Sequence, residues 1–373
     1  MQVSDKPDRK DSMHDKIKEL EDLIGGSKYN KSTQKAIGMY KAQLAKLKEK
    51  RSSKSGGKKG EGFSVRKTGS GTVVLLGFPS VGKSTLLNKL TNANSAVGAY
   101  AFTTLTVIPG TLEYKHAKIQ VLDVPGIVHG AAAGTGRGKE VLAVIRSADL
   151  ILILIDVFHP DHYEALLKEI YDSDVRINQR PPQVKITKTS KGGIDVGSTV
   201  PLTKIDKETI GDIMREFKVN NANVVIREDV DIDRFIDALE ANKTYIPAIL
   251  VLNKIDMVAP SEIEKIKIAL KPDISISAEQ SLHMEELKDL IYDKMRLIRI
   301  YLKEVEKKAD MDEPLILWTG ATLRDLCRKL HKDFEAKFKY AKIWGKSARY
   351  DGQKIIKLDH IMVDQDIIEI RIK

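Results

Sequence analysis

The segment GFPSVGKS, residues 77–84, combines residue types and spacing that suit phosphate binding. Its glycines let backbone N–H groups wrap phosphate oxygens, the ammonium of Lys83 can reach the β- and γ-phosphates, and the hydroxyl of Ser84 can hold Mg²⁺. The apolar run VVLL precedes the segment, and a run of helical character follows it. This context favours a phosphate-binding loop over a glycine-rich turn without a ligand. The predicted nucleotide-binding residues of this loop are Gly77, Phe78, Pro79, Ser80, Val81, Gly82, Lys83, Ser84 and Thr85.

Three further residues could complete a site for Mg²⁺ and the γ-phosphate. Thr104, in FTTLT, can supply a second hydroxyl to Mg²⁺ and a backbone N–H to the γ-phosphate. Asp123 ends the strand-like run IQVLD and can hold Mg²⁺ through water, and Gly126 can offer a backbone N–H that senses the γ-phosphate. Each short pattern is weak alone, but they occur in the order that a GTPase requires. We therefore predict Ser84, Thr104 and Asp123 as metal-binding residues, and Lys83, Thr104 and Gly126 as catalytic residues.

The segment NKID is the most informative about the base of the nucleotide, and it directly follows the apolar run AILVL. The carboxylate of Asp256 can accept two hydrogen bonds from the N1 and N2 edge of guanine. Adenine has no 2-amino donor, so such a site favours GTP over ATP. Lys254 can lie over the base plane, and Asn253 can tie this segment to the phosphate-binding loop. In the later segment SAE, Ser277 and Ala278 complete the predicted set, with the Ala278 N–H offered to guanine O6.

These motifs lie on apolar runs that alternate with helical runs from residue 72 onward. The apolar runs are TVVLLG, KIQVLDV, LILILID and AILVLN, and runs such as STLLNKLTN and KEVLAVIRSA lie between them. Such alternation predicts a parallel α/β sheet. From about residue 172 to 232 a hairpin-like run and the helical ETIGDIMREF interrupt it, which predicts a small α+β insert.

Both ends of the chain predict further parts. Residues 11–24 and 31–50 each place apolar side chains on one helical face, so we expect an antiparallel helical hairpin. Its apolar stripes either cover each other or dock on the following domain. A basic helix is expected near 285–308, and the tail then reads as a strand, a helix and several strands, a compact β-grasp domain or a generic α+β module. The expected boundaries are 1–66 for the hairpin and basic linker, 67–171 and 233–294 for the α/β domain, 172–232 for the insert and 295–373 for the β-grasp domain.

Composition limits the class of protein. With 373 residues, 42% of them hydrophobic, the chain can bury the cores of two to four domains. The run LILILI is far short of the roughly 20 apolar residues of a membrane span, and the charged N-terminus lacks the apolar core of a signal peptide. We therefore expect a cytoplasmic protein with no membrane partner. The single cysteine, Cys327, excludes an intrachain disulfide framework and a cysteine-based metal cluster, and we expect it to be buried in a helix.

Basic residues are concentrated in one segment. The net charge is +10, and residues 41–67 are rich in Lys, Arg, Ser and Gly with almost no acidic residue. Such a segment attracts the phosphate backbone of a nucleic acid, and the alternative is a solvated linker without a fixed partner.

Several segments together resemble a known family. GFPSVGKST, YAFTTLT, DVPGIVHGAAAGTGRGKEVLAVIRSAD and NKID are similar to the Obg and Drg branch of translation-associated GTPases, and GAAAGTGRG is most similar to Drg proteins. The resemblance covers nearly the whole chain and implies an α/β fold: a P-loop GTPase domain with an N-terminal helical hairpin, an α+β insert and a C-terminal TGS-like β-grasp domain. The segment IKLDHIMVDQDIIEIRIK is similar to the last strands of TGS domains, which are often linked to RNA or ribosome contact.

Three positions depart from related GTPases. Ile127 stands where Ras-like GTPases place the Gln that orients the attacking water, so slow intrinsic hydrolysis is expected. His129 stands where relatives often carry an acidic residue, and we interpret it as an exposed switch residue rather than a water-orienting one. Ser80 stands where potassium-activated relatives often carry Asn, and this departure counts against K⁺ activation. The candidate cofactors are Mg²⁺ first and K⁺ second.

The resulting hypothesis is a cytoplasmic GTPase that binds GTP, GDP and Mg²⁺ and switches conformation near Thr104 and 123–138. Its expected partner is the ribosome or a structured RNA, and a regulatory protein is a further candidate. One alternative is a YchF-like ATPase, which departs from the NKxD pattern where this chain has Asp256. Another is a non-hydrolysing RNA-binding scaffold stabilised by GTP.

Overall fold

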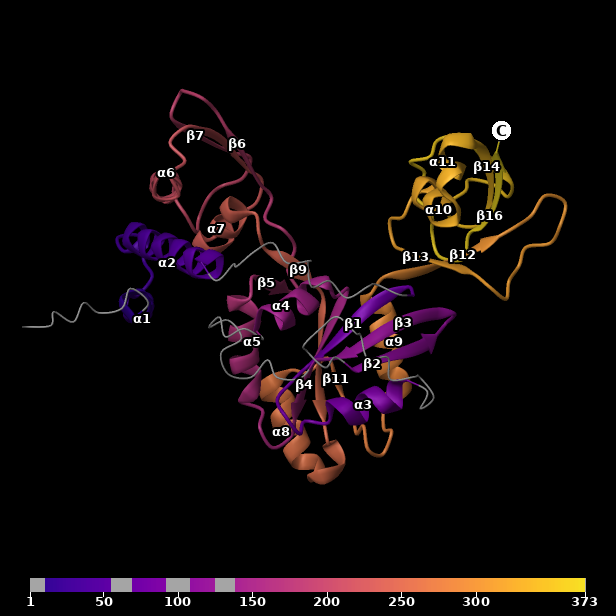
Figure 1. The fold of residues 1–373 in the computed structure, drawn as a ribbon, viewed down its shortest axis with the longest axis horizontal. Coiled ribbons are helices and arrows are strands. Elements are labelled where there is room, and N and C mark those ends of the chain that lie inside the picture. The colour runs from indigo at the N-terminus through magenta and orange to yellow at the C-terminus, as the bar shows by residue number, and fades with distance from the viewer. Residues whose placement is uncertain (1–10, 55–68, 92–107, 125–137, 373) are drawn as a thin grey trace, which may run out of the picture. The chain divides into compact units, whose positions relative to one another are not determined.

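The protein's structure, a computed structural model, describes residues 11–54, 69–91, 108–124 and 138–372 (Figure 1). These residues form two units, each of which is described by itself. The hairpin–insert unit comprises residues 11–54 and 174–245. The main unit comprises the other described residues.

A six-stranded sheet of order β11-β10-β4-β1-β3-β2 forms the centre of the main unit. All neighbouring strands in it are parallel except β2, which runs antiparallel to β3. The predicted α/β sheet is therefore confirmed. The strands are β1 Gly71–Leu76, β2 Ile108–Tyr114, β3 Ala117–Asp123, β4 Leu150–Asp156, β10 Ala248–Asn253 and β11 Ile274–Ser275, and the helices are α3 Lys83–Leu90, α4 Gly138–Ser147, α5 His162–Asp172, η1 Ile255–Met257, α8 Pro260–Leu270 and α9 Met284–Lys294.

Helices cover both faces of this sheet, which explains why its central strands are continuously apolar. Every residue of β4, LILILID, is buried, as parallel strands between two helical layers require. One core cluster joins the sheet to α3 and α9, through residues such as Leu86 and Leu287. Figure 1 shows α4 and α5 on the opposite side of the sheet. The buried sheet thus holds in place the strand ends at which the predicted motifs lie.

The hairpin–insert unit contains a three-stranded sheet of order β6-β8-β7. The prediction of a hairpin between β6 and β7 is wrong. The strand β8 lies between them and pairs antiparallel with β6 and parallel with β7. A two-stranded ribbon, β5 with β9, stands where the insert begins and ends. The elements are α1 Asp11–Gly26, α2 Gln34–Lys54, β5 Val175–Ile177, β6 Val184–Lys188, β7 Ile194–Ser198, α6 Lys207–Glu216, β8 Ala222–Ile226, α7 Ile232–Glu240 and β9 Thr244–Ile246.

The N-terminal helices are docked on the insert. Ile37 and Ala42 of α2 are buried in the same core as Ile213 of α6 and Phe235 of α7. At Gly38 the helices α2 and α6 approach closely, since a Cβ at this position would lie 2.9 Å from Thr209 Cγ2. Ion pairs join α2 to acidic side chains of the insert: Lys35 with Glu208, Lys41 with Asp233 and Lys46 with Glu216, at 2.6, 2.6 and 2.7 Å. Both expected arrangements are therefore present in part. The helices α1 and α2 contact each other, and α2 also docks, on the insert rather than on the domain that follows it in sequence.

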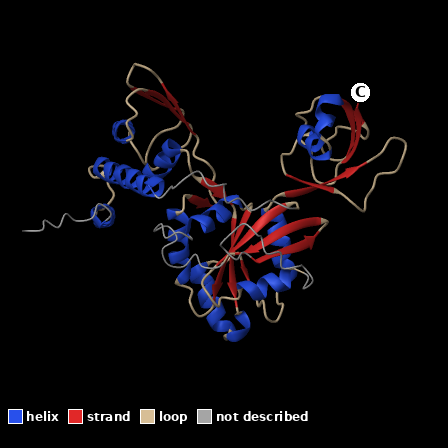
Figure 2. Cartoon of the chain, viewed as in Figure 1, coloured by secondary structure: helices blue, strands red, loops and turns tan. Residues whose placement is uncertain are grey.

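The tail forms a five-stranded sheet of order β13-β12-β16-β14-β15 with two helices (Figure 2). The expected helix near 285–308 is too long: α9 ends at Lys294, and β12 begins at Leu297, because LIRIYL alternates buried and less buried residues with the period of a strand. Cys327 is buried in α10 as expected, and burial raises the pKa of its thiol to about 11. The elements are β12 Leu297–Leu302, β13 Leu315–Trp318, α10 Leu323–Leu330, α11 Lys332–Lys337, β14 Phe338–Trp344, β15 Gln353–Ile355 and β16 Ile367–Ile372.

Among the described residues, no helix combines the length and the apolar composition that crossing a membrane requires.

Candidate functional site

The predicted motifs meet at the carboxyl ends of the parallel strands. The glycine-rich loop follows β1, Asp123 is the last residue of β3, and Asn253 is the last residue of β10. In register, Leu75 of β1 lies opposite Asp123. Ligands of open α/β sheets bind at this edge, so the fold places the motifs where a nucleotide site is expected.

Lys83 is the first residue of α3 and closes the loop on itself. Its Nζ donates hydrogen bonds to the carbonyls of Gly77 and Phe78, at 3.0 and 2.9 Å. Burial lowers the pKa of this ammonium below its usual value, and the nearby charge of Asp123 opposes that effect. A bound anion, such as a phosphate, would give this half-buried ammonium a further negatively charged partner and would stabilise its protonated form.

Gly82 and Asn253 hold the loop in shape. Gly82 has a φ of 99°, in the left-handed region, and a Cβ there would lie 2.4 Å from Asn253 Nδ2. Asn253 Nδ2 donates to the Val81 carbonyl at 2.8 Å. The tie between the NKID segment and the phosphate-binding loop, expected from the sequence, is thus present.

Ser84 and Asp123 form a polar pair suited to a hard cation. Ser84 Oγ donates to Asp123 Oδ2 at 2.9 Å, and the Ser84 residue is exposed. Asp123 is buried, and its Oδ1 has no hydrogen-bond partner among the described residues. A buried carboxylate oxygen without a donor is unfavourable, and one hydroxyl and one carboxylate are oxygen ligands of the kind that Mg²⁺ takes beside phosphates. These residues therefore fit a bound Mg²⁺.

The NKID segment presents one exposed carboxylate beside a fixed lysine. Lys254 has a φ of 66°, and its Nζ donates to Asp156 Oδ2 at 3.2 Å. Burial alone would raise the pKa of Asp156, but hydrogen bonds from Lys254 and His159 bring that pKa below its usual value. Asp256 follows in η1, and its side chain is exposed. Its carboxylate is accessible to a ligand.

The N–H of Ala278 has a partner within the protein. It donates to Asn253 Oδ1 at 3.0 Å and is buried, and its contact with guanine O6 remains a prediction. Ser277 is fully buried, and its Oγ accepts from the Gln280 N–H at 3.1 Å. Both residues therefore shape the loop around Asn253 before any base is bound.

Four predicted or discussed positions lie outside the described residues. They are Thr104, Gly126, Ile127 and His129. The structure thus brings together the glycine-rich loop, Asp123, NKID and SAE. The roles assigned to these residues, and to the four positions outside the described part of the chain, remain predictions.

Asp156, His159 and His162 were not singled out from the sequence. Asp156 ends β4 next to Asn253, with which it pairs in register, and His162 stacks on Phe78 of the loop at a centroid distance of 3.9 Å. A signal for Asp156 was present, because it is a charged residue at the carboxyl end of a buried strand. Nothing in the spacing of the two histidines indicated their stacking.

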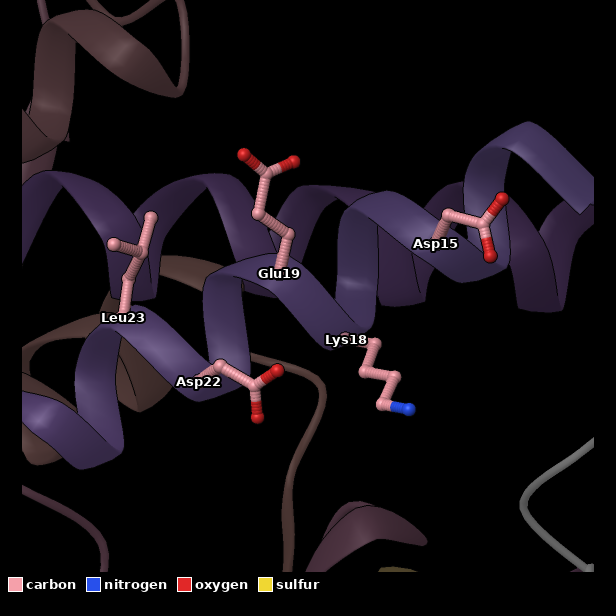
Figure 3. A pocket seen from close by; sticks show the side chains of 5 residues that line it. All are labelled: Asp15, Lys18, Glu19, Asp22 and Leu23. Atoms are coloured by element: carbon pink, nitrogen blue, oxygen red, sulfur yellow. The ribbon is translucent and has the colours of Figure 1, made fainter.

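A shallow hollow along α1 is lined by Asp15, Lys18, Glu19, Asp22 and Leu23 (Figure 3). All five side chains come from one helix, and three of them are carboxylates. Such a surface repels phosphate, and it carries none of the motifs above.

Comparison with known proteins agrees with this geometry. Residues 72–188 match the family described as 50S ribosome-binding GTPase, 191–297 match the C-terminal region of that GTPase domain, and 298–372 match the TGS domain. An uncharacterized GTP-binding protein of Methanocaldococcus jannaschii is 52% identical, over 97% of this chain and 93% of its own length.

Developmentally-regulated GTP-binding protein 1 of Xenopus laevis is 41% identical, over 95% of this chain and 98% of its own. Among solved structures, a GTP-binding protein from Pyrococcus horikoshii OT3 matches with a TM-score of 0.45 at 15% identity, covering 81% of this chain and all of that one, so the assignment rests on the sequence relatives. The glycine-rich loop, the NKID segment and identities of 41% and 52% over nearly the full chain show that the chain belongs to the Drg family of GTP-binding proteins, with a P-loop GTPase domain and a C-terminal TGS domain.

Proposed function

We propose that the protein hydrolyses GTP to GDP and phosphate and uses this reaction as a conformational switch on the ribosome or another RNA assembly. The observation that carries the proposal is the pairing of Ser84 with Asp123, whose second carboxylate oxygen is buried and unpartnered, directly beside the Lys83 loop. This arrangement supports phosphate and metal binding in one place.

In this proposal Ser84 would hold Mg²⁺ directly and Asp123 would hold it through water, with Thr104 as the further predicted ligand. A bound Mg²⁺ would neutralise charge that develops on the phosphates. Lys83 leaves the carbonyls of Gly77 and Phe78 and donates to the β- and γ-phosphate oxygens, where its charge favours the transition state. The backbone N–H groups of the glycine-rich loop orient the phosphates.

Guanine is selected by the NKID segment. The exposed carboxylate of Asp256 accepts from N1 and N2 of the base, and Lys254 covers one base face. Asn253 keeps this segment at a fixed distance from the phosphate-binding loop through Val81. ATP would leave the Asp256 carboxylate without its two donors, which argues against the YchF-like alternative.

The second part of the proposal concerns where the switch acts, on the ribosome or another RNA assembly. Support comes from the basic residues of 41–67 other than Lys41, Lys46 and Lys48, which form ion pairs with carboxylates of this chain. The TGS match and the family description that names 50S ribosome binding add to it. Residues near Thr104 and 123–138 would carry the switch, and a regulatory protein is a further candidate partner.

Steady-state phosphate release from the purified protein tests the chemistry. We expect turnover that depends on Mg²⁺, that excess ATP does not inhibit, and that Lys83→Ala abolishes. Absence of turnover in all conditions, with tight GTP binding, would favour the scaffold alternative.

Co-sedimentation with ribosomes in GTP, GDP and a non-hydrolysable analogue tests the switch, which requires ribosome binding to differ between the GTP and GDP states.

A further inference from the structure

Asp156 connects the base-reading segment to the loop that follows β4. It is the last residue of β4, its side chain is 6% exposed, and it pairs in register with Asn253. Its Oδ2 accepts from Lys254 Nζ at 3.2 Å, and its Oδ1 accepts from the backbone N–H groups of Phe158 and His159 at 3.2 and 3.0 Å. The carboxylate is therefore fixed from both sides, as a group that positions another residue must be.

Three aromatic rings continue from this carboxylate to the phosphate-binding loop. The Nδ1 of His159 lies 3.1 Å from Asp156 Oδ1. The ring of His159 stacks on His162 with centroids 4.8 Å apart, and His162 stacks on Phe78 with centroids 3.9 Å apart and planes 17° from parallel. Phe78 is part of the loop, and its carbonyl accepts from Lys83. A continuous path of contacts thus runs from Lys254 to the phosphate-binding loop.

His162 holds its place through its ring faces. Its Nδ1 is buried and has no hydrogen-bond partner in the described part of the chain. The contacts of this ring that the described residues show are its stacks on Phe78 and on His159.

Lys254 needs a positioning partner because its side chain is long and starts from a sharp turn of the backbone. Its φ of 66° places it in the left-handed region, where the chain turns sharply between β10 and η1. Its long side chain has many rotamers, and its bond to Asp156 selects among them. Without that bond the side chain would lose entropy each time it covers a base.

We propose that Asp156 is a positioning residue that holds Lys254 for contact with the guanine base, and that the Phe78–His162–His159 stack couples this contact to the phosphate-binding loop. The inference rests on guanine-nucleotide binding and deepens the proposed function. It does not depend on hydrolysis or on the ribosome.

A double-mutant cycle on GDP affinity tests the first part. Asp156→Ala should weaken fluorescent GDP binding about tenfold when Lys254 is present and less than about twofold in Lys254→Ala, since coupled residues are non-additive. Asp161→Asn is the charge-matched control: it lies in the same loop, is exposed, makes no cap bond, and should leave affinity unchanged. Additive losses, or no loss in Asp156→Ala, would overturn the assignment.

If Asp156→Ala does not fold, Asp156→Asn runs through the same cycle, because it keeps the side-chain shape and one acceptor. Its coupling to Lys254→Ala then decides. Coupling without any GTP turnover would leave this inference standing and reject only the proposed hydrolysis.

The rate of GDP release tests the ring stack. His162→Ala should accelerate release about two- to tenfold, the range that one aromatic contact accounts for, and His162→Phe should stay within about twofold of wild type. The cycle of Phe78→Ala with His162→Ala should again be non-additive. Release from His162→Phe as fast as from His162→Ala would show that the stack does not couple the two segments.

Discussion

The exposed carboxylate of Asp256 offers only acceptors, whereas an amide at the same position would offer one acceptor and one donor. Asp256→Asn should therefore weaken GTP binding by about 2 to 4 kcal/mol, or about thirty- to a thousand-fold, through loss of charged hydrogen bonds. The variant should shift its preference toward xanthosine triphosphate, whose 2-oxo group needs a donor. Competition binding with labelled GTP measures both effects.

Glu262→Gln provides the control for that substitution. Glu262 is an exposed acidic residue in the first turn of the nearby α8, so its change removes the same charge without touching the base site. We expect its GTP affinity to equal that of wild type. Equal affinities for Asp256→Asn and Glu262→Gln would remove Asp256 from base recognition.

Residues that belong to contiguous motifs could be predicted from the sequence, and residues that act through tertiary contacts could not. Gly82, Lys83 and Asn253 stand in short patterns, and the structure joins the loop to NKID as expected. The donation of the Ala278 N–H to Asn253 was missed, because a pattern does not state which of two acceptors, protein or base, an N–H meets first. The stack of Phe78 on His162 joins residues 84 positions apart by number, so no local spacing encodes it.

At the scale of elements, the close approach of α2 to α6 depends on Gly38. Gly38→Leu should lower the free energy of unfolding by about 1 to 3 kcal/mol through overpacking against Thr209 and Ile213. Because leucine is a good helix former, a loss of helix propensity would not account for this destabilisation. Hydrogen exchange should become faster in α2 and α6, while GTP affinity stays unchanged.

Gly25→Ala is the matched control in the same hairpin. A Cβ at Gly25 would meet nothing within 4 Å, so exchange in α2 and α6 should not become faster. Protection in Gly38→Leu equal to that in Gly25→Ala would contradict the described packing of α2 on α6.

Element types were predictable where apolar periodicity was strong, and their pairing was not. The runs TVVLLG, LILILID and AILVLN became buried parallel strands, as their composition indicated. The insert strands β6 and β7 are separated by β8, which comes later in the chain, and local sequence gives no sign of such an insertion between them. The docking of α2 on α6 and α7 likewise joins residues that are 170 to 192 positions apart.

At the scale of the whole molecule, the basic segment is expected to contact RNA. If it neutralises about three phosphates, a fourfold rise in salt should weaken ribosome or RNA binding about 40-fold, and the TGS domain alone should bind weakly. Because α2 is part of the insert core, deleting the N-terminal residues would also disrupt that core, so substitution is the sharper test. Lys58, Lys59 and Lys67 changed to Gln should reduce both affinity and salt slope.

The matched control changes three exposed lysines of the insert, Lys185, Lys188 and Lys191, to Gln. It removes the same charge from a different segment of the chain and should have the smaller effect. Equal effects of the two triple variants would mean that net charge alone governs binding, and an unaltered salt slope in the first would make the segment a linker.

Ile127 raises the question of what activates the attacking water. An aliphatic side chain can neither orient water nor accept its proton, so this help must come from a monovalent cation, a switch backbone group or a bound partner. Added positive charge at the phosphates is worth roughly 10³ to 10⁵ in rate when an arginine finger supplies it. Ile127→Ala and His129→Ala should therefore keep most of the stimulated activity.

The most direct test of the central claim, a slow GTPase activated from outside its own side chains, is GTP turnover with and without ribosomes, in potassium and in sodium. We expect slow turnover by the isolated protein in sodium. Ribosomes or potassium should stimulate it strongly, in wild type and in both variants alike. Fast turnover by the isolated protein in sodium, abolished by His129→Ala, would contradict the account, because the water would then be activated from within the switch.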